Sequence, residues 1–256
     1  MSTEDILSRP QPPPDERVAY GVDANQFLEV RLPNTKAPHP VLLNIHGGYW
    51  RAEYSLTHAG YLCEAFRAAG LATFNTEYRR IGNPGGGWPG SFEDIRSAYR
   101  FLQQEHARFQ LDLEKLVVMG HSAGGQLALC LAAHEASIDR VISLAGVVDL
   151  KRAYALHLSN DAVAEFLGGK PDAVPEHYFE ADPMEVSIPR ARQWLLHGKE
   201  DDTVPPEFSR DYVSRKRKAD ESVTLKELPH ADHFDLITPA SQAFGQVKST
   251  VMAALG

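Results

Sequence analysis

The chain lacks the cysteine pattern of a disulfide-stabilised or zinc-binding protein. Cys63 and Cys130 are the only two cysteines among 256 residues, and their spacing matches neither a disulfide framework nor a metal site. Both fall in apolar helical patterns, so we expect buried free thiols, as is usual in a reducing compartment.

Long apolar runs are also missing. No run approaches the ~20 residues that are needed to cross a bilayer. The first residues, Met-Ser-Thr-Glu-Asp, lack the basic and apolar regions of a signal peptide. We therefore expect a cytoplasmic protein without a membrane partner. Proline-rich residues 10–14 indicate that residues 1–16 form a flexible N-terminal arm.

Positive charge is in short supply. Lysine and arginine total 26 against 34 acidic residues, a formal net charge of −8. A nucleic-acid surface needs clustered basic side chains, so no nucleic-acid partner is expected. The basic run at 215–218 is followed at once by Asp220 and Glu221, which is typical of a solvated helix end.

What the chain does have is an alternation of short apolar runs with helical patterns. This order favours an α/β fold, with a mostly parallel central sheet and helices on both faces. A length of 256 residues suits one domain, from residue 17 to 256. The strands are expected at 27–32, 41–45, 72–75, 116–119, 141–144, 194–196 and 223–227. The helices are expected at 58–69, 92–109, 123–135, 206–218 and 240–255.

Two stretches depart from the alternation. Residues 150–189, between two predicted strands, suit a small cap-like insertion with short helices such as Asp161–Leu167. A glycine-rich loop at 81–90 matches G-x-G-x-x-G by chance, because Pro89 interrupts it and the helix begins only afterwards. We read it as an active-site loop that carries Trp88. In the helix that follows, Ser91 is expected to form the N-terminal cap, with Asp94 three residues on.

The most informative motif is Gly-His-Ser-Ala-Gly at 120–124, between a predicted strand and a predicted helix. A Gly-x-Ser-x-Gly turn of this kind is so tight that Gly120 and Gly124 must leave room for the backbone. The hydroxyl of Ser122 then projects at the carboxyl edge of the sheet, where the helix N-terminus favours a developing anion. Ser122 is therefore the candidate nucleophile.

A serine hydroxyl needs a base, and the base needs an acid that orients it. Acid candidates follow the strand at 194–196, in His-Gly-Lys-Glu-Asp-Asp-Thr-Val-Pro at 197–205. Base candidates follow the last strand, in His-Ala-Asp-His at 230–233. The order nucleophile, acid, histidine is that of an α/β-hydrolase. A metal site at His230, Asp232 and His233 would lack a further strong ligand cluster, so no metal is expected.

Resemblance to the α/β-hydrolase family makes these assignments specific. His-Gly-x-x-Asp-x-x-Val-Pro at 197–205 looks like the family's acid loop, and Asp-His-Phe at 232–234 is similar to its histidine loop. On that match Asp201 is the acid and His233 is the base. Asp202 is a solvated neighbour, and His230 is a loop residue near the pocket.

The segment His-Gly-Gly-Tyr-Trp at 46–50 follows the strand at 41–45. It is similar to the His-Gly-Gly-Gly loop of esterases and lipases, whose backbone N–H groups stabilise the oxyanion. The similarity implies that Gly48, Tyr49 and Ala123 supply these N–H groups. It also implies that His46 and Gly47 support the loop.

The Tyr-Trp variant of this loop resembles kynurenine formamidase (arylformamidase) and related small carboxylesterases. The lead-in at residues 20–33 and Glu-Tyr-Arg-Arg at 77–80 extend the resemblance over the chain from about Tyr20 to its end. It implies a cofactor-independent serine hydrolase of a small N-formyl amide, with a general carboxylesterase as the alternative. A peptidase is less favoured because the cap is short, and a binding protein that has lost catalysis is least favoured because no triad member is missing.

The substrate pocket is less defined by the sequence. The partner is expected to be a small molecule, and an aromatic leaving group would lie against Trp50 or Trp88. Arg51, Arg79 and Arg80 would bind a substrate carboxylate or form surface salt bridges. A homodimer is left open.

Overall fold

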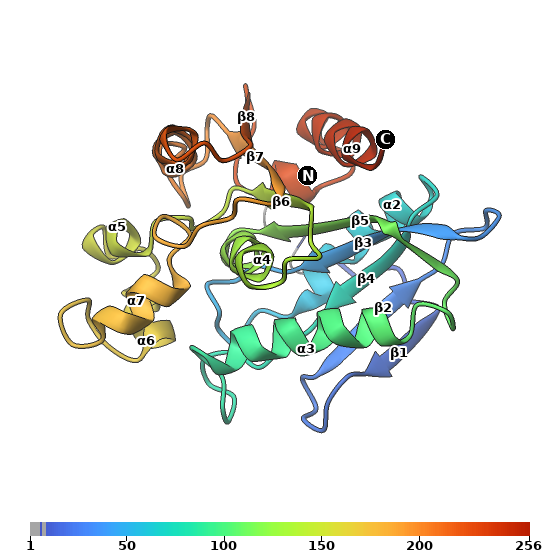
Figure 1. Cartoon of the computed structure of the whole chain (residues 1–256), viewed down its shortest axis with the longest axis horizontal. Coiled ribbons are helices and arrows are strands. Elements are labelled where there is room, and N and C mark those ends of the chain that lie inside the picture. The colour runs from blue at the N-terminus through green and yellow to red at the C-terminus, as the bar shows by residue number, and fades with distance from the viewer. Residues whose placement is uncertain (1–5, 7–8) are drawn as a thin grey trace.

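The computed structural model describes Ile6 and residues 9–256, and these residues form a single eight-stranded sheet (Figure 1). The strand order is β1-β2-β4-β3-β5-β6-β7-β8. β1, β2 and β4 pair antiparallel, and the strands from β4 through to β8 pair parallel. The strand bounds are Glu16–Ala19, Phe27–Arg31, His39–Ile45, Ala72–Thr76, Leu111–His121, Arg140–Leu144, Arg192–Gly198 and Val223–Leu228.

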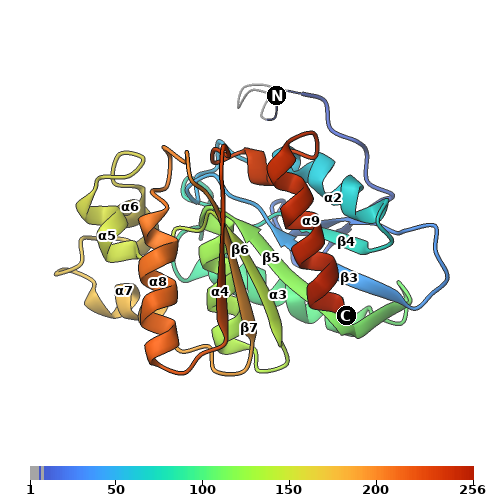
Figure 2. The ribbon, with the colours of Figure 1, turned by 90° about the horizontal axis from the view of Figure 1, so that it is seen from above.

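Helices cover both faces of the sheet (Figures 1 and 2). α2 (Gly60–Arg67) and α9 (Gln242–Leu255) pack on one face, and α3 (Gly90–Gln104), α4 (Ala123–His134) and α8 (Glu207–Lys218) on the other. Successive side chains of a strand point to opposite faces. Leu43 of β3 accordingly packs in the cluster of α3 and α4, whereas Leu42 packs with α2 and α9.

Residues between β6 and β7 form a cap at one end of the molecule (Figures 1 and 2). The cap contains three short helices, α5 (Leu150–Ala155), α6 (Ala162–Leu167) and α7 (Pro175–Ala181). This is where the sequence predicts an insertion, and the helix predicted at 161–167 corresponds to α6.

The predicted α/β fold is confirmed, and each predicted strand overlaps an observed one. The strand β1 is absent from the prediction. Two 3-10 helices, η1 (Leu56–Ala59) and η2 (Asp235–Ile237), were likewise not predicted. β1 is an edge strand of four residues, and its only sheet partner among the described strands is β2. Because only one of its four residues, Val18, is buried, its sequence carries little hydrophobic pattern.

The prediction that Ser91 caps α3 is wrong. The helix begins at Gly90, with Pro89 in the capping position and no side-chain cap bond. The Ser91 hydroxyl donates to the carbonyl of Arg79 and accepts the N–H of Gly87. It therefore ties the glycine-rich loop to the segment that follows β4 instead of capping the helix.

The N-terminal segment, expected to be a loose arm, is fastened to the domain over its described part. The Tyr61 hydroxyl donates to the carbonyl of Pro10 at 3.0 Å, and the Arg31 guanidinium donates to that of Pro12 at 2.7 Å. Arg67 forms an ion pair with Asp15 at 3.1 Å. Residues 1–5, 7 and 8 of the predicted arm lie outside the described residues.

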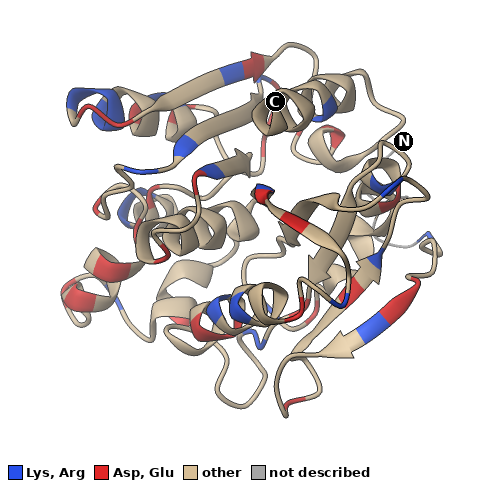
Figure 3. Cartoon of the chain, turned by 45° about the vertical axis from the view of Figure 1, so that its right-hand side comes forward, with Lys and Arg blue, Asp and Glu red and all other residues tan. Residues whose placement is uncertain are grey.

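Acidic and basic residues are interspersed over the ribbon in Figure 3, including along α8 with its basic last turn. None of the described helices is both long and apolar enough to cross a membrane. Cys63 and Cys130 are buried free thiols, as predicted, and burial raises the pKa of Cys63 to about 12.

Candidate active site

Ser122 occupies a sharp turn between β5 and α4. Its φ of 56° and ψ of −121° lie in a region that non-glycine residues rarely adopt. A serine at the start of a helix usually caps it, but here no side-chain cap bond forms. The Ser122 backbone N–H instead donates to the carbonyl of Leu144 in β6 at 2.8 Å. The hydroxyl is thereby left available at the carboxyl edge of the sheet.

Both glycines of the motif are required because a Cβ at either position would clash with the backbone. A Cβ on Gly120 would stand 2.0 Å from the carbonyl oxygen of Gly124, and one on Gly124 would stand 2.1 Å from that of Ile45. Real Cβ atoms do not approach backbone so closely. The turn that carries Ser122 can therefore form only with glycine on both sides.

His233 and Asp201 face one another from loops that follow β8 and β7. His233 Nδ1 lies 2.7 Å from Asp201 Oδ2, and both side chains are nearly fully buried. The N–H at Nδ1 donates to the carboxylate, so in the neutral imidazole Nε2 is unprotonated and can accept a proton. Asp202, in contrast, is exposed and accepts the hydroxyl of Thr203 at 3.3 Å.

The Asp201 carboxylate is held by several donors. Its Oδ1 accepts the backbone N–H groups of Thr203 and Val204 at 2.9 and 2.8 Å, and His197 Nε2 lies 3.3 Å from Oδ2. Burial alone would raise the pKa of Asp201, but the hydrogen bonds from His197 and His233 hold it well below its ordinary value. The acid is ionised at neutral pH and can stabilise a cationic His233.

Sequence reasoning did not assign a role to His197, although it stands in the acid loop. Its Nε2 faces both Asp201 and the carbonyl of Val204, at 2.8 Å, so this nitrogen carries the proton. Nδ1 lies 2.7 Å from the hydroxyl of Ser209. His197 is fully buried and braces the loop from behind.

The loop at 46–50 takes an unusual conformation. Gly48, Tyr49 and Trp50 have φ values of 109°, 49° and 58°. A Cβ on Gly48 would lie 2.4 Å from Cβ of Tyr54, so glycine is required there. Among the described residues, no backbone acceptor is paired with the N–H of Gly48, Tyr49 or Ala123. Gly48 and Tyr49 line the same cavity as Ser122, and Ala123 follows Ser122 in the chain.

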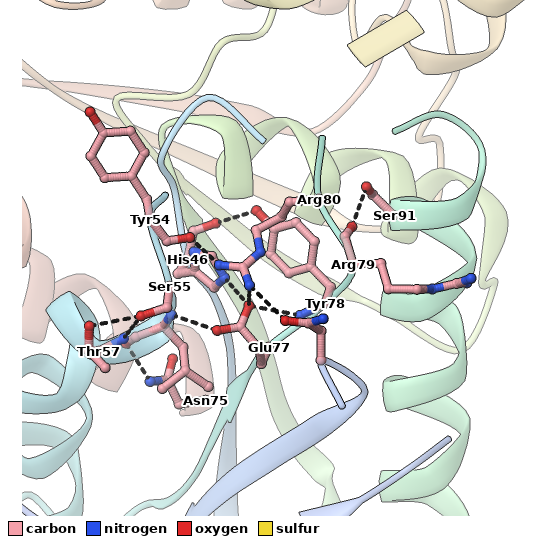
Figure 4. A network of polar contacts seen from close by, with 12 residues as sticks. His46, Tyr54, Ser55, Thr57, Asn75, Glu77, Tyr78, Arg79, Arg80 and Ser91 are labelled. Atoms are coloured by element: carbon pink, nitrogen blue, oxygen red, sulfur yellow. Dashed lines mark hydrogen bonds and ion pairs between the residues drawn. The ribbon is translucent and has the colours of Figure 1, made fainter. Parts of the chain in front are cut away.

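A buried polar network supports this loop (Figure 4). Glu77, at the end of β4, accepts His46 Nε2 at 3.0 Å, the Leu56 backbone N–H at 3.1 Å and Arg80 at 3.2 Å. The Tyr78 ring stacks on His46 with centroids 4.6 Å apart, and its hydroxyl donates to the His46 carbonyl at 3.0 Å. Three residues of this network, Glu77, Tyr78 and Arg80, belong to the Glu-Tyr-Arg-Arg segment, to which sequence reasoning assigned no role in supporting the loop.

Tyr49 also connects the loop at 46–50 to the loop that follows β7. Its hydroxyl donates to the carbonyl of Thr203 at 2.9 Å. Burial, followed by the charge of Asp201, raises the pKa of Tyr49 to about 12. The phenol therefore stays neutral and keeps its proton for this hydrogen bond over the whole physiological pH range.

A cavity of about 260 Å³ opens at this site, and Ser122, His233, Gly48 and Tyr49 all line it. The remaining lining residues are Tyr54, His58, His121, Ser159, Thr203 and Phe234. Ser159 comes from the cap, so the cap forms one wall. Ligand pockets usually exceed ~300 Å³, so this space suits a small molecule.

The two tryptophans do not take the place that was expected of them. Trp50 is fully buried, stacks on Phe166 of α6 with centroids 4.4 Å apart and donates from Nε1 to Gln126 at 3.0 Å. Trp88 stacks on Phe92 of α3, with centroids 5.1 Å apart. Neither is among the described residues that line the cavity, because both rings are taken up by packing in and beneath the cap.

Two further histidines of the cavity wall were not assigned by sequence reasoning. His121, inside the pentapeptide, donates from Nε2 to the carbonyl of His233 at 2.9 Å. Burial, followed by the neighbouring His233, lowers the pKa of His121 well below its ordinary value. Burial also lowers the pKa of His58 to about 3, with His46 as the next cause. Both histidines are neutral at working pH.

The trio that resembled a metal site is divided. His230 is exposed and pairs with Glu200 at 3.0 Å, whereas His233 turns inward to Asp201. Within the described residues, no group of three or more His, Cys, Asp or Glu side chains is placed to hold a metal ion.

Fold and sheet topology define an α/β-hydrolase. Solved structures agree with this class, although at this identity they show the fold alone. Esterase B from Lactobacillus rhamnosis is 20% identical, with a TM-score of 0.79 over 96% of this chain and 88% of that one. A truncated carbohydrate esterase from gut microbiota is also 20% identical, with a TM-score of 0.81 over 95% of this chain and 99% of that one.

The family model BD-FAE matches residues 28–215, well over half of the chain, which therefore belongs to the BD-FAE family. Esterase LipC of Mycobacterium tuberculosis is 30% identical over 250 residues, which cover 88% of this chain and 60% of LipC. A versiconal hemiacetal acetate esterase of Aspergillus parasiticus is 31% identical over 172 residues, 66% of this chain and 48% of that enzyme. The chain thus spans about half to three-fifths of the length of these relatives.

Proposed function

We propose that this protein is a carboxylesterase that works through a Ser122-His233-Asp201 triad and an acyl-enzyme. One observation carries the proposal: Ser122, on its strained turn, and His233, bonded to the ionised Asp201, line the same small cavity. The relatives named above are esterases, which supports an ester as the substrate.

In this mechanism Nε2 of His233 takes the proton of the Ser122 hydroxyl as Oγ attacks the ester carbonyl. The amides of Gly48, Tyr49 and Ala123 stabilise the oxyanion, and one such donor is worth about 3–4 kcal/mol of barrier. His233 then protonates the leaving alcohol. Water repeats the steps on the acyl-enzyme and releases the carboxylic acid. Asp201 keeps the imidazole oriented and stabilises its cation.

A small N-formyl amide is the second candidate. The His-Gly-Gly-Tyr-Trp loop resembles that of arylformamidases, and a formyl group would fit a cavity of about 260 Å³. The chemistry would be the same, with an amine leaving in place of an alcohol. Because the named relatives are esterases, the ester is the first choice and the formamide is the alternative to be measured beside it.

The test is hydrolysis of p-nitrophenyl acetate, p-nitrophenyl butyrate and N-formyl-L-kynurenine, together with labelling by a fluorophosphonate. The probe forms a bond from Ser122 Oγ to phosphorus, and fluoride leaves. We expect labelling, and a kcat/KM above ~10⁴ M⁻¹s⁻¹ for an ester, within the usual range for enzymes. A larger value for the formamide would move the assignment to an arylformamidase.

Ser122→Ala and His233→Ala should each lower kcat by a factor of ~10⁴ to 10⁶ while the protein stays folded. His230→Ala is the matched control, since this histidine is exposed and pairs with Glu200 instead of Asp201. It should keep nearly full activity. Labelling of the Ser122→Ala protein, or normal turnover by folded His233→Ala, would refute the triad. A wild-type protein that binds esters without labelling would be a binding protein.

A further inference from the structure

Arg51 joins the proposed oxyanion loop, residues 46–50, to the cap. Its backbone N–H donates to the carbonyl of Gly48 at 3.0 Å, and it forms an isolated bridge with Ile81. Its guanidinium donates to the carbonyls of Ser159 and Asn160 at 2.9 and 3.3 Å. One side chain therefore connects two loops that are more than a hundred residues apart in the sequence.

The same guanidinium also pairs with Glu165 of α6, at 2.9 Å. Arg51 thus has three partners in the cap, and its side chain is only 21% exposed. A carboxylate of the substrate would have to displace these partners. We therefore do not assign Arg51 to substrate binding, although its place beside the oxyanion loop suggests it.

The cap segment that Arg51 holds is strained. His157, Ser159, Asn160 and Asp161 all have positive φ, between 50° and 59°. This conformation is energetically unfavourable for non-glycine residues, and it persists where the surrounding structure holds the backbone in place. His157 closes the segment by pairing with Asp161 at 2.7 Å, but both side chains are exposed. Arg51 donates hydrogen bonds from the main body of the fold to the backbone of this segment.

The held segment matters because Ser159 lines the same cavity as Ser122 and His233. Ser159 accepts the hydrogen bond from Arg51 with its backbone carbonyl and not with its hydroxyl. How far this residue stands from Ser122 is thus set by where its backbone is fixed. A shift of the segment would widen or narrow the cavity without touching the nucleophile, the acid or the base.

We propose that Arg51 is a positioning residue that sets the width of the cavity on its cap side, and thereby limits the size of the ester that is accepted. The inference rests on the proposed esterase function. It assigns the size limit to a contact between two loops and not to a residue of the triad or of the oxyanion hole.

The experiment measures kcat and KM for two ester series. One varies the acyl chain of p-nitrophenyl esters from acetate to octanoate, and the other varies the alcohol of acetates from methyl to octyl. In Arg51→Met, we expect the ratio of kcat/KM for the longest to the shortest ester to rise at least fivefold in one series. The rise should come from a lower KM for the long ester. Arg51→Lys, which keeps a cation able to reach the carbonyls, should restore most of the wild-type ratio.

Arg152→Met is the matched control. Arg152 lies in α5 of the cap and pairs with Asp211, and neither residue lines the cavity. A merely structural loss of a cap ion pair would affect thermal stability in both variants, but only Arg51→Met should change size selectivity. An unchanged ratio in both series for a folded Arg51→Met protein would overturn the inference.

Ser159→Asn gives a second and independent test, and it decides the matter if Arg51→Met does not fold. Asparagine tolerates the left-handed conformation and is larger than serine. It should narrow the cavity and lower the long-to-short ratio at least threefold in one series. No change in either series would contradict the proposal. If wild-type protein neither hydrolyses esters nor labels at Ser122, the proposed function itself fails, which is a different result from unchanged selectivity in an active enzyme.

Discussion

The two regions that line the cavity are built in different ways. Ser122, Asp201 and His233 stand on short loops that directly follow β5, β7 and β8, so the sheet backbone positions them. The cap contains only short helices among its described residues, of six to seven residues each, and is held by side chains from distant segments. The comparison teaches that the backbone of the sheet places the proposed triad, whereas tertiary contacts place the cap wall of the cavity.

The contacts that hold the cap form a chain. Trp50 stacks on Phe166 and donates to Gln126 of α4, and Gln126 Nε2 donates to the carbonyl of Ala181 at 2.8 Å. The backbone N–H of Trp88 donates to the carbonyl of Phe166 at 2.7 Å. Both tryptophans therefore fasten the cap to the domain, and neither is among the described residues that line the cavity.

The sharpest test on the sheet side compares two neighbouring acids. Asp201→Asn should lower kcat by a factor of about 10⁴, because the amide no longer holds His233 in the right tautomer or stabilises its cation. Asp202→Asn should change kcat less than about twofold, since Asp202 is exposed and accepts the hydroxyl of the neighbouring Thr203. Steady-state kinetics on p-nitrophenyl butyrate measure both. The opposite ranking would move the acid by one position.

On the cap side, two phenylalanines make a matched pair. Phe166 is 1% exposed and stacks on Trp50, whereas Phe179 of α7 is 61% exposed. Phe166→Ala should lower the free energy of unfolding by about 3–5 kcal/mol, because it leaves a cavity. Phe179→Ala should cost less than about 0.5 kcal/mol. Urea denaturation gives both values, and equal costs would show that the stacking does not anchor the cap.

The smallest expected effect concerns pH. Burial lowers the pKa of folded His58 from 6.5 to about 3, so between these values the unfolded chain binds a proton that the folded chain does not. His58 therefore does not lower the free energy of unfolding above pH 6.5. As the pH falls below 6.5, this one group lowers the free energy of unfolding by about 1.4 kcal/mol per pH unit. At pH 5 the loss from this group is about 2 kcal/mol.

His58→Gln removes the titrating group and should flatten the fall in the free energy of unfolding between pH 7 and pH 5 by about that amount. Urea denaturation at several pH values measures the slope. His121 is shifted in the same direction and keeps part of the dependence in the variant. Identical slopes in variant and wild type would contradict the buried, neutral state of His58.

Local sequence predicted the turn of the pentapeptide, whose glycines are needed wherever this turn forms. Apolar runs made the ends of β7 and β8 recognisable, and resemblance to the α/β-hydrolase family selected Asp201 and His233 in the loops that follow them. The predictions that proved wrong concern side chains that can bond to more than one partner. Ser91 can cap a helix in the sequence, but in the fold its hydroxyl reaches the carbonyl of Arg79.

The sequence by itself determined the α/β fold, the order of its strands along the chain and the turn that exposes Ser122, because hydrophobic period and glycine sterics act over a few residues. Only the tertiary structure decided that Trp50 packs under the cap, that Glu77 braces His46 and that Arg51 holds Ser159 beside the cavity. Those contacts join residues far apart in the chain, and an aromatic or charged side chain takes whichever partner the packed domain brings within reach.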